Sequence, residues 1–106
     1  MTFEGYDGSE RVLLHYDVRG VARHLAARVC HIVFGRVRRP VNGGPERIEK
    51  AFVHRPGVVW VGQSVLILPP RDAEELAERL RGLGAWVAFV SVSVSSAGLR
   101  AFRRPR

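Results

Sequence analysis

The side chains best suited to chemistry in this sequence are its arginines. The chain of 106 residues has sixteen arginines and a single lysine, and its formal net charge is +7. A guanidinium is planar, permanently charged and able to bind a phosphate through two parallel hydrogen bonds. The sequence therefore predicts a small basic protein that binds nucleic acid, either RNA or DNA, through its phosphates. The residues expected to make these contacts are Arg23, Arg28, Arg36, Arg38, Arg39, Arg103 and Arg104.

His15 and Asp17 form a second group that could do chemistry. They are two positions apart in a β-prone segment, so both side chains should project from the same side of a strand. An imidazole beside a carboxylate can share a proton or ligate a metal. A third ligand would have to come from elsewhere, for instance from His54, and no recognisable spacing supplies it. We therefore expect no metal and no cofactor, keep Asp17 as the one candidate catalytic residue, and favour binding over catalysis.

Two short segments are similar to a known family. Residues 15–18 (HYDV) and 63–66 (QSVL) resemble segments of the small dimeric CRISPR-associated proteins of spacer acquisition. The resemblance implies a ferredoxin-like fold, a homodimer, and a metal-dependent nuclease in which Asp17 of each subunit binds the metal. That nuclease is one alternative to simple binding. Another is a basic subunit of a larger complex, whose arginines meet an acidic protein.

The first half of the chain must position most of these arginines. Residues 11–18 are apolar and β-prone, and they predict a strand. An apolar stripe at helical spacing predicts an amphipathic helix over residues 20–31, with a basic outer face that carries Arg23 and Arg28. Residues 32–39 could extend this helix or begin a strand, and Gly35 favours a strand. Such a strand would place Phe34 beside the arginines, as a stacked base next to a held phosphate requires.

The second half of the chain also predicts strands together with one helix. Residues 47–54 predict a short strand or an irregular segment. Residues 58–68 are almost continuously apolar, which indicates one central strand, with Gly62 marking a bulge or a close backbone approach. Asp72 followed by Glu75 predicts a capping box that opens a helix over residues 72–82. Valine alternates with serine in residues 85–95, which predicts a strand with one buried face.

The predicted order is β-α-β-β-α-β in an α+β fold. We expect a ferredoxin-like split β-α-β, in which two helices cover one face of an antiparallel sheet. Another small α+β sandwich, with an additional hairpin within residues 32–54, remains open. The predicted organisation is a flexible arm at 1–10, a single domain at 11–97 and a basic tail at 98–106. Pairing along the 85–95 strand, or packing of the bare sheet face, would form a homodimer.

The amino-acid composition indicates the cellular location and the kind of organism to expect. The single cysteine, Cys30, excludes an internal disulfide. No apolar run approaches the roughly 20 residues that span a bilayer, and no secretory signal is visible, so we expect a cytoplasmic protein without a membrane partner. Asn42 and Gln63 are the only side-chain amides. Their scarcity suits a protein of a thermophile, or a GC-rich genome that favours arginine over lysine.

Overall fold

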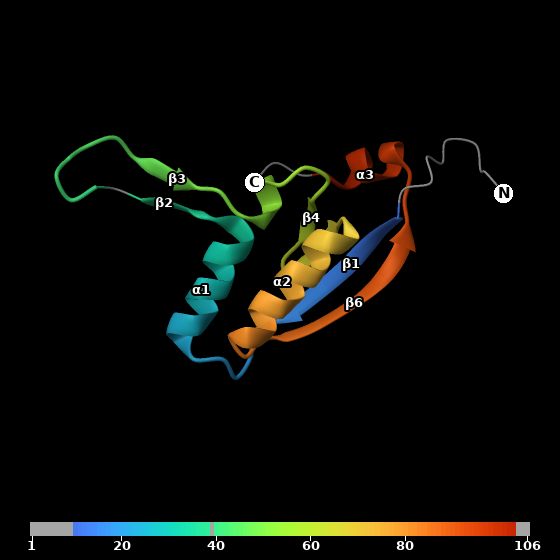
Figure 1. Ribbon diagram of the computed structural model, residues 1–106, viewed down its shortest axis with the longest axis horizontal. Helices are drawn as coiled ribbons and strands as arrows, with labels where there is room; N and C mark the ends of the chain where they lie inside the picture. Colours follow the sequence, from blue (N-terminus) through green and yellow to red (C-terminus); the bar gives the residue numbers. More distant parts are fainter. Residues whose placement is uncertain (1–9, 39, 104–106) are drawn as a thin grey trace.

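An antiparallel sheet of four strands forms the centre of the structure (Figure 1). The computed structural model describes residues 10–38 and 40–103, without the side chains of residues 38 and 47–49. The strands are β1 (Glu10–Asp17), β2 (Arg36–Arg38), β3 (Arg47–Glu49), β4 (Val59–Gly62), β5 (Val65–Leu68) and β6 (Trp86–Ser93). The helices are α1 (Arg23–Phe34), the 3-10 turn η1 (Phe52–His54), α2 (Pro70–Gly82) and α3 (Ser96–Phe102). The four-stranded sheet has the order β4-β5-β1-β6, while β2 and β3 pair only with each other.

The core lies between one face of this sheet and the helices α1 and α2. Leu14 of β1 is opposite Leu66 of β5 in the ladder, and both are fully buried. Val33 of α1 and Leu76 of α2 belong to the same buried cluster. Because α1 and α2 share this core, both cover the same face of the sheet (Figure 1). The predicted α+β class with an antiparallel sheet is therefore confirmed.

Helix α1 continues further than the sequence predicts. It spans Arg23–Phe34 instead of 20–31, so Phe34 ends a helix and does not begin a strand. The Phe34 ring packs edge-on against Trp60, with ring centres 6.0 Å apart, and this contact holds the last helical turn in place. Gly35 then adopts a φ of 77°, a conformation that a residue with a Cβ rarely takes. The expectation that Phe34 stands beside Arg36 on one strand is wrong.

The apolar run at 58–68 is a hairpin and not one strand. β4 and β5 pair antiparallel, and Gln63 makes the turn with a φ of 43°. The indole Nε1 of Trp60 donates to the carbonyl oxygen of Gln63 at 3.1 Å, which ties the turn to β4. The register shifts between Trp60 and Gly62, so the bulge expected at Gly62 is confirmed.

Helix α2 forms without the predicted capping box. It begins at Pro70, two residues before Asp72, and Pro69 occupies the cap position with no side-chain hydrogen bond. Proline suits the first helical position because its missing N–H would have no partner there. The carboxylates of Asp72 and Glu75 instead accept hydrogen bonds from Arg55.

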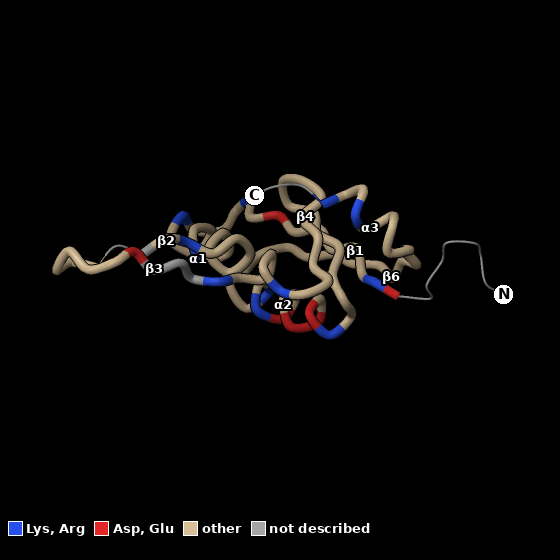
Figure 2. Tube along the Cα trace, turned by 90° about the horizontal axis from the view of Figure 1, so that it is seen from above, with Lys and Arg blue, Asp and Glu red and all other residues tan. Residues whose placement is uncertain are grey.

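A third helix, which the sequence did not predict, begins at the end of the predicted domain and continues into the expected tail. The side chain of Ser95 accepts from the N–H of Gly98 at 3.0 Å and caps α3. α3 contacts β4 and lies across the sheet from α2 (Figure 2). The prediction of two helices on one face is therefore corrected to two helices on one face and a short third on the other. Residues 1–9 of the predicted N-terminal segment and the last three residues of the predicted tail lie outside the described residues.

No helix in the described part of the chain is long and apolar enough to cross a bilayer.

Candidate anion-binding cleft

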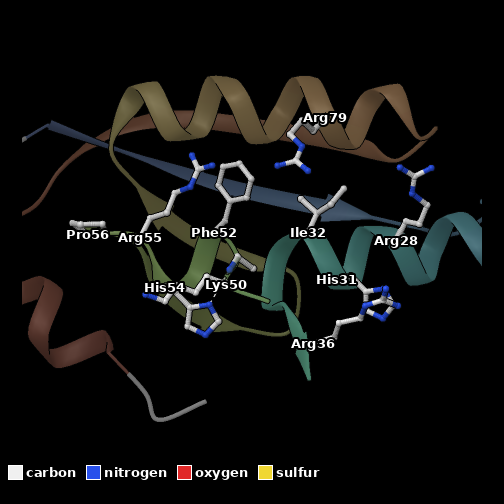
Figure 3. A pocket seen from close by; sticks show the side chains of 11 residues that line it. Arg28, His31, Ile32, Arg36, Lys50, Phe52, His54, Arg55, Pro56 and Arg79 are labelled. Carbon is white, nitrogen blue, oxygen red and sulfur yellow. Dashed lines mark hydrogen bonds between the residues drawn. The ribbon is translucent and has the colours of Figure 1, made fainter. Parts of the chain in front are cut away.

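Cationic side chains from four segments surround one open cleft of about 960 Å³ beside α1 (Figure 3). We call it the cationic cleft. Its lining residues are Arg28, His31, Ile32, Arg36, Lys50, Ala51, Phe52, His54, Arg55, Pro56 and Arg79. Five of them are arginine or lysine, and none of the lining residues within 10–38 and 40–103 is acidic. A concave surface lined by one sign of charge concentrates counter-ions, so this cleft is suited to an anion.

Helix α1 forms one wall of the cleft through a single face. Arg28, His31 and Ile32 are spaced at i, i+3 and i+4, which places them together on one side of a helix. Val29 and Val33 point to the core and fix the rotation of the helix. The buried stripe therefore determines that Arg28 and His31 face the cleft.

The opposite wall is built on Phe52. This residue is 1% exposed and anchors the turn η1 in the core. The Arg55 guanidinium carbon lies 3.9 Å from the centre of the Phe52 ring, within the range of a cation–π contact. His54 accepts a hydrogen bond at Nδ1 from the N–H of Ala51, at 2.9 Å, so its Nε2 is the ring nitrogen left to donate.

An ion-pair network holds Arg55 in place between η1 and α2. Its two terminal nitrogens donate to the two oxygens of Glu75 at 2.9 and 3.0 Å, and Nη1 also donates to Asp72 at 3.0 Å. The hydrogen bonds to Glu75 are the largest cause that raises the pKa of Arg55. In return, the hydrogen bond from Arg55 lowers the pKa of the Glu75 carboxyl. Arg79 extends the network, with 3.9 Å between its Nη1 and Glu75 Oε2.

The cleft brings together two of the predicted phosphate-binding residues, Arg28 and Arg36. Arg23 is exposed at the first turn of α1, and Arg103 is exposed after α3; neither lines the cleft. Arg38 lies in β2, with its side chain not described. Arg39 and Arg104 lie outside the described residues. Sequence reasoning thus identified one wall of the site.

The remaining cationic residues of the cleft were missed. Lys50 and Arg55 lie close together in the segment KAFVHRP, and Arg79 stands in the last turns of α2. The close spacing of Lys50 to Arg55 around a single phenylalanine was the available signal. It could not show that this segment folds against α1, because that contact depends on Phe52 entering the core.

Asp17, the candidate catalytic residue, is held by a neighbour. Its Oδ1 accepts from the backbone N–H of Arg19, and its Oδ2 accepts from the Arg19 guanidinium, both at 2.8 Å. These two hydrogen bonds lower the pKa of Asp17, the backbone bond contributing most. The His15 ring packs edge-on against Trp86, with ring centres 5.5 Å apart. In the described part of the chain, no three histidine, cysteine or acidic side chains come together as metal ligands would.

No known protein family, curated protein or solved structure matches this chain.

Proposed function

We propose that this protein binds nucleic acid by holding its phosphates in the cationic cleft. One observation carries the proposal: five arginine and lysine side chains, from segments far apart in the sequence, converge on one cleft, and they outnumber the two carboxylates, of Asp72 and Glu75, that pair with Arg55 and Arg79. Phosphate esters are the anions for which guanidinium groups offer matching, two-point hydrogen bonds.

The walls of the cleft favour backbone contacts over base recognition. Arg55 already covers a face of the Phe52 ring at 3.9 Å, which leaves that face closed to a stacked base. Contacts to phosphate position a protein on nucleic acid without reading its sequence. The proposed binding is therefore tolerant of sequence and strongly dependent on salt.

We further propose that the core is a ferredoxin-like split β-α-β with an inserted β2–β3 hairpin. Two features support it: the strand order β4-β5-β1-β6 with every neighbouring pair antiparallel, and the placement of α1 and α2 on one face. A cytoplasmic location and an origin in a thermophile remain predictions. So does the homodimer expected from the sequence.

The test is the salt dependence of binding in wild type and in paired variants. Binding of labelled single- and double-stranded RNA and DNA is measured at about 50 and about 200 mM salt, where the log–log slope should be near −0.9 per phosphate neutralised on B-DNA. Arg28→Ala and Arg36→Ala should each weaken binding and reduce the slope by about one. Arg71→Ala removes the same charge from an exposed position on α2 outside the cleft and serves as the matched control.

Two results would contradict the proposal. The first is equal affinity at the two salt concentrations. The second is a loss of affinity in Arg71→Ala as large as in Arg28→Ala. If poly-glutamate displaces the oligonucleotide at an equal concentration of charge, the result would instead favour the alternative function, in which the protein is a basic subunit that binds an acidic protein.

A further inference from the structure

Strand β6 is an edge of the four-stranded sheet, and its own residues lack the features that usually protect an edge from pairing. Residues 82–99, which include all of β6, contain no charged side chain and no proline. Val90 is 58% exposed. The other edge, β4, has only four residues and carries the bulge at Trp60 and Gly62. Natural sheets discourage edge pairing with charges, prolines, bulges and short strands, and β6 has none of these along its eight residues.

The hydrogen bonds of β1 determine which backbone groups of β6 face outward. The N–H of Tyr16 donates to the carbonyl oxygen of Ser64, on the side away from β6, at 3.1 Å. Tyr16 is opposite Val87 in the ladder, so these two residues form a pair without mutual hydrogen bonds. Because the pattern alternates along an antiparallel pair, the N–H and C=O groups of Val87, Phe89, Ser91 and Ser93 point to the open edge.

Arg81 occupies one end of this edge. Its Nη2 donates to the carbonyl oxygen of Val87 at 2.9 Å, and its guanidinium carbon lies 5.4 Å from the centre of the Phe89 ring. A strand that paired with Val87 would have to displace this guanidinium. Among residues 10–38 and 40–103, no other contact is described at this edge from Phe89 to Ser93, and this segment is the part open to pairing.

We propose that a second copy of this chain pairs with β6 in antiparallel orientation, with the two-fold axis at Ser91. Ser91 then faces Ser91 of the other copy, Phe89 faces Ser93, and Val90 faces Val92. The three outward-facing residues that Arg81 leaves open, Phe89, Ser91 and Ser93, are all used, and in each copy the hydrogen bond from Arg81 to Val87 stays intact. An axis at Phe89 would require Val87, and an axis at Ser93 would extend the pairing beyond the end of β6.

The segment is complementary to itself in this register. Each of the pairs at Phe89, Ser91 and Ser93 exchanges two backbone hydrogen bonds. Valine meets valine on one face, and serine meets serine or phenylalanine on the other, so no charge is buried and no like charges oppose each other. A two-fold axis requires such self-complementarity of a single surface. The two four-stranded sheets become one of eight strands, and the cationic cleft takes no part in the interface.

A disulfide scan tests both the partner and the register. In a Cys30→Ser background, Ser91→Cys should form a covalent dimer on mild oxidation, because facing Cα atoms in such a pair are about 5.5 Å apart and within reach of a disulfide. Ser93→Cys is the matched control, since it is exposed on the same strand and face. In the proposed register the two thiols introduced by Ser93→Cys would lie about 14 Å apart and should stay reduced.

A proline substitution gives a second reading that involves no cysteine. Ser91→Pro removes an N–H that points to the open edge and spares the ladder with β1, so the variant should fold and be monomeric by light scattering. A wild type that stays monomeric at all concentrations overturns the proposal, as does equal cross-linking at positions 91 and 93. A dimer that survives Ser91→Pro but is lost in Val90→Lys would also overturn it, because the contact would then lie on the sheet face. None of these measurements involves nucleic acid, so their outcome is independent of phosphate binding.

Discussion

Arg55 connects three parts of the molecule through one side chain. It stacks on Phe52, pairs with Asp72 and Glu75 of α2, and lines the cationic cleft. Its side chain is 35% exposed, so solvent screens these contacts only in part. The residue thus stabilises the wall of the site to which it also adds charge.

Replacing Arg55 should cost measurable stability. We expect Arg55→Ala to lower the free energy of unfolding by about 1–2 kcal/mol, because it leaves two carboxylates without their hydrogen-bond donor. Arg55→Lys should recover little of this, since an ammonium cannot bind both oxygens of Glu75 in a fork. Urea denaturation measures the difference. Arg79→Ala, whose ion pair is longer at 3.9 Å, should change stability by less than about 0.5 kcal/mol, and a larger effect there would argue against the central role of Arg55.

The same network makes stability depend on pH. Arg55 holds the pKa of Glu75 below its ordinary value of 4.5 in the folded state, while the unfolded chain lacks this contact. As the pH falls, the unfolded chain therefore binds a proton at Glu75 before the folded protein does. The stability that the Arg55–Glu75 pair adds is fully present above the ordinary pKa of Glu75, and it is lost as the pH falls through the lower pKa of the folded state. Unfolding midpoints from about pH 6 to about pH 3 should fall less steeply in Glu75→Gln than in wild type. Parallel curves would mean that Glu75 does not carry this dependence.

At the level of elements, apolar periodicity predicted the helices better than the strands. The stripe of α2 is predicted correctly because Ala73, Leu76 and Leu80 are all buried where their spacing puts them. For residues 85–95 the alternation points to the wrong face. Val90 and Val92 lie on the face opposite α2, while Ser91 shares the face of buried Val12. An alternating pattern shows that a strand has two different faces. Which of the two faces is buried depends on the side of the sheet on which the helices pack.

The cleft shows the same limit on what sequence alone could predict. Arg28 could be assigned to the outer face of a helix, because that depends only on local spacing. The meeting of Lys50 and Arg55 with this face depends on Phe52 packing into the core, and on α1 extending to Phe34. Both are tertiary contacts, and neither leaves a periodic signal in the sequence.

The end of α1 offers a direct test of this local geometry. Gly35 has a φ of 77°, so Gly35→Ala should lower the free energy of unfolding by about 1–3 kcal/mol. Gly82→Ala is the matched control, because Gly82 is helical and a Cβ there would meet nothing within 4 Å. It should raise stability by about 0.4–1 kcal/mol. Equal effects of the two changes in urea denaturation would show that backbone conformation does not explain the role of Gly35.

At the level of the whole molecule, the β2–β3 hairpin projects from the body as an arm (Figure 1). Val41, between β2 and β3, is fully exposed, and no side chain described within 37–48 belongs to the buried core. The arm leaves from Arg36 and returns to Lys50, both of which line the cleft. The hairpin is therefore a separable extension of the proposed binding surface.

Removing the arm should separate binding from folding. If residues 37–48 are replaced by a short Gly-Ser turn, we expect the melting temperature to change by no more than a few degrees, since no described core residue is lost. Affinity for nucleic acid should fall and its salt slope should become shallower, because the arginines of the arm, Arg38, Arg39 and Arg47, are removed. Thermal unfolding and oligonucleotide titration measure the two effects. A large drop in melting temperature would show instead that the arm supports the core.

The flat, extended outline of the molecule has a practical consequence in solution. Its extents are 57 × 34 × 20 Å and its radius of gyration is 15.7 Å, against about 13 Å for a compact chain of this length. Such a shape has more friction than a sphere of equal mass, so it diffuses more slowly and leaves a gel-filtration column early. A single chain would therefore elute like a larger protein. Elution volume alone would overstate the number of subunits, and only a direct measurement of mass can count them.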